Sequence, residues 1–198
     1  MCGIAGFVTQ NANKPMRPIV EHMVSTIVHR GPDDSGVWVD KSAGVSLGHR
    51  RLSIVDLSLA GHQPMESVSN RYVMVFNGEI YNHLLLREEL SSAVTSDLSV
   101  SRDTCVSFAS SGSVDWKGHS DTETLLSCFE AWGFEATLNK TVGMFAIALW
   151  DKQERKLYLA RDRLGEKPLY YGWVDGAFVF GSELKVLKAY PGFNNAIS

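Results

Sequence analysis

Apolar positions recur every three or four residues in some parts of this chain and in short runs in others. This pattern predicts a mixture of helices and strands. Residues 15–31 have the helical period, with one apolar stripe from Ile19 to Val28, and Gly31 and Pro32 close the segment. Further helices are predicted at 83–90, 120–134 and 183–190. For 120–134, Ser120 and Glu123 form a capping box and Gly133 ends the helix.

Short apolar runs bounded by turn residues predict the strands. They lie at 4–9, 35–40, 45–56, 71–82, 144–151, 156–162, 168–174 and 177–182. Helical and strand segments are interleaved rather than strictly alternating. We therefore expect one α+β domain over residues 1–198, with mostly antiparallel sheets and helices packed outside them.

Residues 91–115 interrupt this organisation. Serine is abundant there, and the apolar residues follow no sustained period. We interpret the segment as an exposed insertion within the single domain.

Composition and charge argue against several classes of function. The net charge is −3 and the basic residues are scattered, which argues against a nucleic-acid surface. No apolar run approaches the length of a membrane span, and the first residues lack the pattern of a signal peptide, so we expect a cytoplasmic protein. Three cysteines without CxxC spacing argue against a disulfide framework and against a zinc site, so no metal is expected.

Cys2 is the first candidate for chemistry. If Met1 is removed, one residue carries both a thiol and a free α-amine, whose reference pKa of about 7.7–8.0 suits a general base. A nucleophile and its base then share a residue, as in enzymes with an N-terminal nucleophile. The alternative is a small buried cysteine without a chemical role.

Asn77 and Gly78, in "FNGEIYN", are candidates for an oxyanion hole, through a side-chain amide and an unhindered backbone N–H. Asn-Gly is also the commonest hairpin-turn signal. Here, however, the sequence after it becomes helical instead of continuing as an alternating strand. Glu79, directly after the glycine, is suited to binding a cation.

Arg51 and Asp121 suit an amino-acid substrate. Arginine binds carboxylates in a bidentate manner, and an aspartate can bind an ammonium group. Each also has a structural alternative. Arg51 could be a surface residue, and Asp121 could be a charge that favours the helix dipole.

Seven blocks occur in an order that resembles one family: "MCGIAGF", "HRGPDDSG", "RRLSIVD", "FNGEIYN", "GHSDTETLL", "GMFAIALWD" and "RDRLGEKPLYYG". They resemble the N-terminal glutaminase domain of glutamine-hydrolysing asparagine synthetases, which are class II glutamine amidotransferases among the N-terminal-nucleophile (Ntn) hydrolases. The resemblance covers nearly the whole chain except residues 91–115, and ordered blocks are more specific than any single motif. It implies a four-layer αββα sandwich of two mostly antiparallel sheets.

The resemblance also implies roles for individual residues. Cys2 would be the nucleophile after loss of Met1, with Asn77 and Gly78 as the oxyanion hole. Arg51 would bind the glutamine α-carboxylate, and Glu79 and Asp121 would surround the α-ammonium group. The remaining residues of "RLSIV" would line the pocket: Leu52, Ser53, Ile54 and Val55.

The partners implied are L-glutamine and a C-terminal synthetase domain, in cis or in trans. That domain is absent from these 198 residues. ATP and Mg²⁺ are expected only there, and no cofactor is expected for this domain. A homodimer is compatible with the sequence. Two alternatives stay open: an amidotransferase domain that serves another carboxylate acceptor, such as a surface-polysaccharide sugar, and a non-catalytic domain that senses glutamine. The family also has a much shorter link where this chain has residues 91–115.

Overall fold

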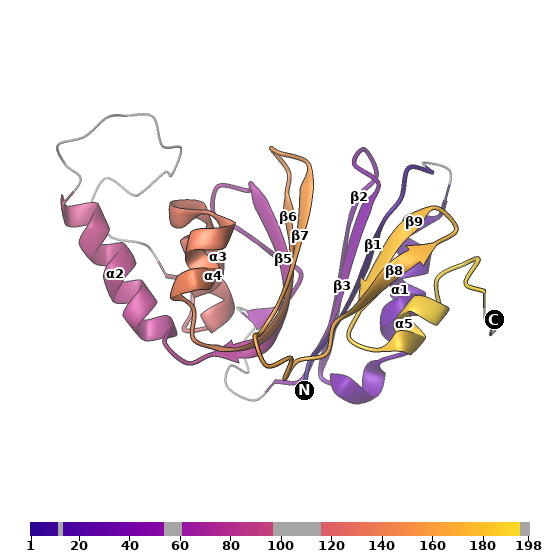
Figure 1. Ribbon diagram of the computed structural model, residues 1–198, viewed down its shortest axis with the longest axis horizontal. Helices are drawn as coiled ribbons and strands as arrows, with labels where there is room; N and C mark the ends of the chain where they lie inside the picture. The colour runs from indigo at the N-terminus through magenta and orange to yellow at the C-terminus, as the bar shows by residue number, and fades with distance from the viewer. Residues whose placement is uncertain (12–13, 54–60, 97–115, 195–198) are drawn as a thin grey trace.

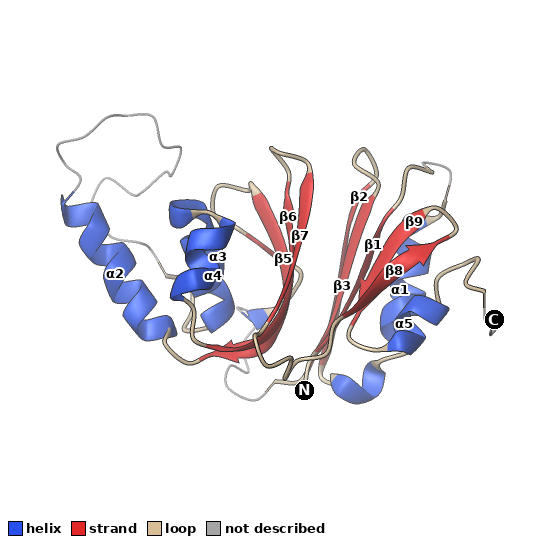
Figure 2. Ribbon diagram, viewed as in Figure 1, coloured by secondary structure: helices blue, strands red, loops and turns tan. Residues whose placement is uncertain are grey.

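The computed structural model describes residues 1–11, 14–53, 61–96 and 116–194. Two sheets lie face to face, and helices cover the outer face of each, which gives four layers (Figures 1 and 2). All neighbouring strands in both sheets are antiparallel. The expected α+β sandwich is confirmed.

The first sheet has the strand order β2-β3-β1-β9-β8. Its strands are β1 (Gly3–Val8), β2 (Asp34–Asp40), β3 (Val45–Arg51), β8 (Tyr170–Val174) and β9 (Ala177–Gly181). The strand that follows Cys2 is therefore central, with Gly3 opposite Arg50 of β3. This register places the start of β1 and the end of β3 side by side, at the same end of the strands.

The second sheet has the order β4-β5-β6-β7. Its strands are β4 (Met65–Glu66), β5 (Tyr72–Ile80), β6 (Gly143–Asp151) and β7 (Lys156–Arg161). Asn77 and Gly78 lie within β5, opposite Ala146 and Phe145 of β6. The Asn-Gly pair is therefore part of a strand and not a hairpin turn.

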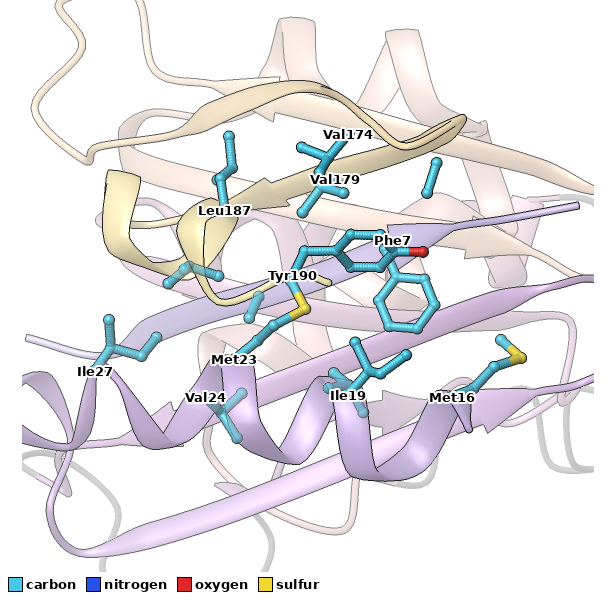
Figure 3. Packing of buried hydrophobic residues seen from close by; sticks show 14 residues of the cluster. Phe7, Met16, Ile19, Met23, Val24, Ile27, Val174, Val179, Leu187 and Tyr190 are labelled. Atoms are coloured by element: carbon cyan, nitrogen blue, oxygen red, sulfur yellow. The ribbon is translucent and has the colours of Figure 1, made fainter. Parts of the chain in front are cut away.

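Helices α1 (Met16–Ser25) and α5 (Leu184–Lys188) cover the outer face of the first sheet. Figure 3 shows their packing, in which the ring of Tyr190 meets that of Phe7 edge to face, 5.1 Å between centroids. The apolar stripe predicted for α1 supplies Ile19, Met23 and Ile27 to this buried cluster. Burial of this stripe holds the helix on the sheet.

Helices α3 (Asp121–Trp132) and α4 (Phe134–Lys140) lie on the outer face of the second sheet, and α2 (His83–Ser96) packs against α3 on the side away from the sheet (Figure 2). Half of the predicted capping box of α3 is confirmed, because Ser120 Oγ accepts a hydrogen bond from the Glu123 N–H at 3.3 Å. The Glu123 carboxylate accepts from the N–H groups of Lys117 and Gly118 rather than from that of Ser120. Gly133, at φ 78°, ends the helix as expected. Cys128 lies on the buried face of α3, where burial raises the pKa of its thiol to about 12.

A third apolar cluster fills the space between the sheets, with Ile4 and Leu47 from one side and Val75 and Ala148 from the other. His49 crosses this space, and its Nε2 lies 3.1 Å from the carbonyl oxygen of Phe76 on β5. Burial lowers the pKa of His49 to about 4, although the hydrogen bond with Phe76 opposes the shift. The neutral imidazole therefore donates this bond and joins the two sheets beside Asn77.

Several element boundaries differ from the prediction. The helix expected over 15–31 ends at Ser25, and a short 3₁₀ turn, η1 (Val28–Arg30), follows. The hydroxyls of Ser25 and Thr26 donate to the carbonyls of His22 and Met23, which competes with continued helix formation.

Two other differences lie on the second half of the molecule. Helix α2 continues to Ser96, past the point where the insertion was expected to begin, and residues 97–115 lie outside the described part of the chain. Helix α4 was not predicted. Its Phe134 stacks between Phe129 and Tyr158, so packing and not local pattern supports it.

His49 makes stability depend on pH. Its folded pKa is below the unfolded value of about 6.5, so stability is complete above that value and is lost as pH falls towards 4. Between pH 7 and pH 5 this residue should lower the free energy of unfolding by about 2 kcal/mol. Urea unfolding of the parent and of His49→Gln at pH 7 and pH 5 measures this change in the free energy of unfolding. The variant should show a smaller loss, and equal losses would contradict the buried neutral imidazole.

Candidate active site

A pocket of about 420 Å³ is lined by residues from the start of β1, the ends of β3 and β5 and the beginning of α3. Each predicted site residue that the structure describes lines it: Cys2, Arg51, Leu52, Ser53, Asn77, Gly78, Glu79 and Asp121. Residues distant in sequence are thus gathered in one place. Ile54 and Val55, also predicted to line the pocket, lie outside the described residues.

Cys2 is half-buried and held through both its backbone and its side chain. Its Sγ accepts a hydrogen bond from the Leu52 N–H at 3.4 Å, and its carbonyl oxygen accepts one from Arg30 Nε at 3.0 Å. These contacts fix the thiol directly before the central strand β1, where it lines the pocket.

Arg30 is itself anchored. Its Nη1 lies 3.2 Å from Glu183 Oε1, at the start of α5. Partial burial would raise the pKa of Glu183, but hydrogen bonds from Lys185, His29 and Arg30 dominate and lower it to about 2. The carboxylate is therefore charged at any physiological pH and keeps Arg30 directed at Cys2.

Asn77 has the properties of an oxyanion-hole donor. Its side chain is only 2% exposed, and its Nδ2 is buried without a hydrogen-bond partner among the described residues. A buried amide N–H group without a partner costs about 1–3 kcal/mol of stability. Such a group in a pocket indicates that a ligand acceptor completes it.

Gly78 permits the close packing beside Asn77. A Cβ at this position would lie 2.3 Å from the carbonyl oxygen of Met144 and 2.8 Å from Cα of Phe145. Any side chain would therefore push β5 away from β6. The residue must be glycine for reasons of space, independently of any role of its N–H.

The strand before Asn77 is tied on both sides at Phe76. The Phe76 N–H donates to Gln63 Oε1 at 2.7 Å, and its carbonyl oxygen accepts from His49. Gln63 is 5% exposed and lines the pocket as well. Two buried side chains thus fix the backbone that carries the Asn77 amide.

Arg51 ends β3 with a buried side chain, 8% exposed. Gly61 packs against it so closely that a Cβ there would lie 2.2 Å from Arg51 Nη2. Beyond it, the Ser53 N–H donates to Asp33 Oδ2 at 2.8 Å, which holds the chain as it leaves the strand. A buried guanidinium group in a pocket favours a carboxylate ligand.

Asp121 supplies the opposite charge on the other wall. It is the first residue of α3, and its Oδ2 accepts a hydrogen bond from the Ile80 N–H at 3.0 Å. Burial raises the pKa of Asp121, and the hydrogen bond from Ile80 only partly offsets this. A cationic ligand would relieve the unfavourable burial. Glu79 is exposed and adds negative charge at the rim.

Among the residues that the prediction missed are Arg30, which holds Cys2 from outside the pocket lining, and the lining residues Gln63 and Lys167. Lys167 lines the pocket with a side chain that is 7% exposed overall, and its Nζ donates to Met1 Sδ at 3.7 Å. Arg30 and Lys167 lie in "HRGPDDSG" and "RDRLGEKPLYYG", two of the blocks that carry the family resemblance, although the resemblance implies no role for either residue. The blocks themselves were the available signal.

In the described part of the chain, no three His, Cys, Asp or Glu side chains group as metal ligands would. Within the same residues, no helix is long and apolar enough to cross a membrane. The predicted residues gathered in the pocket bring together a thiol, an amide, a guanidinium and carboxylates.

Comparison with known proteins gives one family over the full length. A family model described as a glutamine amidotransferase domain matches residues 1–198. Asparagine synthetase [glutamine-hydrolyzing] 3 of Bacillus subtilis is 36% identical over 199 residues, covering 96% of this chain and 28% of the relative. The putative asparagine synthetase [glutamine-hydrolyzing] 2 of Methanocaldococcus jannaschii is 33% identical, covering 98% and 36%. The chain thus spans about a third or less of these relatives.

Solved structures agree on the fold. The glutamine phosphoribosylpyrophosphate amidotransferase of B. subtilis, complexed with ADP and GMP, superposes with a TM-score of 0.72 at 18% identity. The match covers 96% of this chain and 43% of that one. The sandwich is therefore an Ntn-hydrolase fold.

The cysteines should differ in reactivity. Cys2 is half-buried in the pocket, whereas Cys128 is fully buried with its pKa raised to about 12, so almost none of it is thiolate at pH 8. In a Cys105→Ser background, iodoacetamide should label Cys2 at least about tenfold faster than Cys128. Peptide mapping by mass spectrometry measures the rates. Faster labelling of Cys128 would contradict the burial described for α3.

Proposed function

Since this chain belongs to the glutamine amidotransferase domain family, we propose that it hydrolyses L-glutamine to L-glutamate and ammonia, with Cys2 as nucleophile. The observation that carries the proposal is one pocket that holds a half-buried thiol and a buried amide N–H without a protein partner. That pairing suits attack on a carbonyl.

The first half of the reaction forms a thioester. After Met1 is removed, the free α-amine of Cys2 takes the thiol proton, directly or through one water. The thiolate attacks the side-chain carboxamide carbon of glutamine, and the oxygen becomes negatively charged. Asn77 Nδ2 and the Gly78 N–H donate hydrogen bonds to that oxygen. The Cys2 ammonium then gives its proton to the departing nitrogen, and ammonia leaves.

The second half releases glutamate. Water attacks the thioester carbon while the same α-amine takes a proton from it. The Asn77 amide again stabilises the oxyanion of the tetrahedral intermediate. When the intermediate collapses, the C–S bond breaks, the α-ammonium returns its proton to the Cys2 sulfur, and glutamate leaves. The steps use only groups of this chain and water, so we propose no cofactor for this half-reaction.

The substrate's two charges fit opposite walls of the pocket. The α-carboxylate would pair with Arg51, and the α-ammonium with Asp121 and Glu79. Each group is supported by its burial or position: a buried guanidinium, a carboxylate whose pKa burial raises, and a second carboxylate at the rim. One cationic and two anionic groups in the same pocket favour an α-amino acid over an uncharged amide.

The relatives' greater length and their printed names support a role within a larger enzyme. The ammonia formed here would pass to a synthetase region that follows the glutaminase domain. We assign ATP and Mg²⁺ to that region, with aspartate as the acceptor that it activates.

Cys2→Ala should abolish glutamine hydrolysis without unfolding the protein, because the substitution removes a thiol and little buried surface. An uncleaved N-terminal extension should be equally damaging, since it converts the α-amine to an amide that cannot accept a proton. Glutamate release, with mass spectrometry of the N-terminus, tests both. As a matched control, Cys128→Ala should retain hydrolysis. Full activity with the extension would contradict the α-amine as base.

Asn77→Ala and Asp121→Asn should affect different kinetic constants. Loss of one oxyanion donor lowers kcat by about 10²–10³-fold, with a smaller effect on KM. Asp121→Asn should instead raise KM for glutamine by about 30-fold or more, because the substrate ammonium loses a charged partner worth about 2 kcal/mol or more. Steady-state kinetics separate the two effects. If Asn77→Ala changed KM alone, the oxyanion assignment would be wrong.

A further inference from the structure

Arg87 lies outside the pocket, yet its contacts converge on the segment that leads into Asp121. It projects from α2 with a side chain that is 11% exposed. Its guanidinium carbon lies 4.0 Å from the ring centroid of Trp116, which is the first described residue before α3. The ring and the guanidinium group therefore stack, a contact that strengthens when water is excluded.

The same guanidinium group makes a fork of hydrogen bonds. Nη1 donates to the Gly118 carbonyl and Nη2 to the Ser120 carbonyl, both at 3.0 Å, and Nε donates to Thr124 Oγ1 at 2.7 Å. One planar group thus joins α2 to residues 116–120, which lead into Asp121, and to the first turn of α3. Lysine cannot reproduce this geometry, because its ammonium is a point charge without the fixed fork.

Glu123 of α3 holds the same segment, and we refer to Arg87 and Glu123 together, with the residues 116–120 that they hold, as the clamp. Its carboxylate accepts hydrogen bonds from the N–H groups of Lys117 at 2.7 Å and Gly118 at 3.1 Å, and it lies 3.5 Å from Arg87 Nη2. Residues 116–120 are therefore held by two charged side chains, one on each helix. Besides capping α3 as predicted, this block of sequence forms a structured wall of the pocket.

The clamp leads directly to the substrate groups. His119 and Ser120 line the pocket, and Asp121 follows as the first residue of α3. A shift of the segment would move the Asp121 carboxylate, which a hydrogen bond from the Ile80 N–H joins to the end of β5. We propose that Arg87 is a positioning residue that sets the ammonium subsite of the proposed glutaminase through this segment, an inference that rests on the proposed function.

The proposal separates binding from chemistry. Arg87 contacts neither Cys2 nor Asn77 among the hydrogen bonds of the described residues, so its loss should leave the reacting groups in place. Arg87→Lys should raise KM for glutamine by about tenfold while kcat changes less than about twofold, because a displacement of about 1 Å at a subsite is costly. Arg87→Met should do the same or more.

Arg71 offers a matched control. It also pairs with a carboxylate, Asp151, and stacks on a ring, Tyr72, but it lies at the far end of β5 from the pocket. Arg71→Lys should lower the melting temperature without changing KM. A general loss of rigidity would raise KM in both lysine variants.

The experiment compares glutamine with 4-carbamoylbutanoate, which lacks the α-amino group, in the parent, Arg87→Lys, Arg87→Met and Arg71→Lys. The ratio of kcat/KM values should fall at least about fivefold in the Arg87 variants only, because they lose the ammonium contact. An unchanged ratio in a folded Arg87→Lys protein would overturn the proposal. So would an equal fall in Arg71→Lys.

Hydrogen exchange distinguishes this failure from failure of the proposed function. The amides of Lys117 and Gly118 should exchange at least about tenfold faster in Arg87→Lys than in the parent, whether or not glutamine is a substrate. If the parent protein did not hydrolyse glutamine but its Lys117 and Gly118 amides were protected from exchange, the glutaminase assignment and the ammonium subsite would both be refuted. The contacts of Arg87 and Glu123 with residues 116–120 would still stand. Unchanged exchange in Arg87→Lys would refute the clamp.

Discussion

The hydrogen bonds that hold Cys2 at the edge of a central strand are the constraint on which the rest of the site depends. Arg30 fixes its carbonyl, and the Leu52 N–H contacts its sulfur, so the residue cannot fray as chain ends ordinarily do. Arg30 is in turn held by Glu183, near the other end of the described chain. The thiol thus occupies a defined position only after β1, β3 and α5 have assembled.

The pocket is divided between the two sheets, which makes its geometry a property of their packing. Cys2 directly precedes β1 and Arg51 ends β3 of one sheet, whereas Asn77 and Gly78 belong to the other sheet and Asp121 to the helix that covers it. The distance between thiol and amide therefore depends on the apolar cluster between the layers. His49 adds a direct tie there, one residue before Asn77, and its low pKa keeps the tie in one protonation state.

Much of this arrangement could be predicted from the sequence, because short stretches of residues determine it locally. Ser120, Glu123 and Gly133 define α3, and the ordered motifs predicted the sandwich and the residues that gather in the pocket. Asn77–Gly78 has the composition of a turn, but it falls within the strand predicted over 71–82, and its pairing with β6 confirms that strand. Local pattern was insufficient where packing decides. Helix α4 is supported by Phe134, which stacks on the neighbouring Phe129 and on Tyr158 of β7, a ring that is distant in sequence.

The positioning residues escaped prediction for a different physical reason. Arg30, Gln63 and Arg87 act through hydrogen bonds to backbone atoms of distant segments, and no periodicity or spacing in the sequence records such partners. An arginine that looks like a surface residue in a helical pattern can be the group that sets a binding site. The reacting groups are few and recognisable, while the groups that place them depend on the folded chain.

The most direct test of the account is covalent capture of the nucleophile by a glutamine analogue that carries a diazoketone in place of the carboxamide, 6-diazo-5-oxo-L-norleucine. Mass spectrometry should find one adduct per chain, formed with loss of nitrogen, on the Cys2 thiol of protein from which Met1 has been removed. Excess glutamate should slow its formation. An adduct on another residue, or equally fast capture by protein with an uncleaved N-terminal extension, would contradict the assignment of Cys2 and its α-amine as the reacting pair.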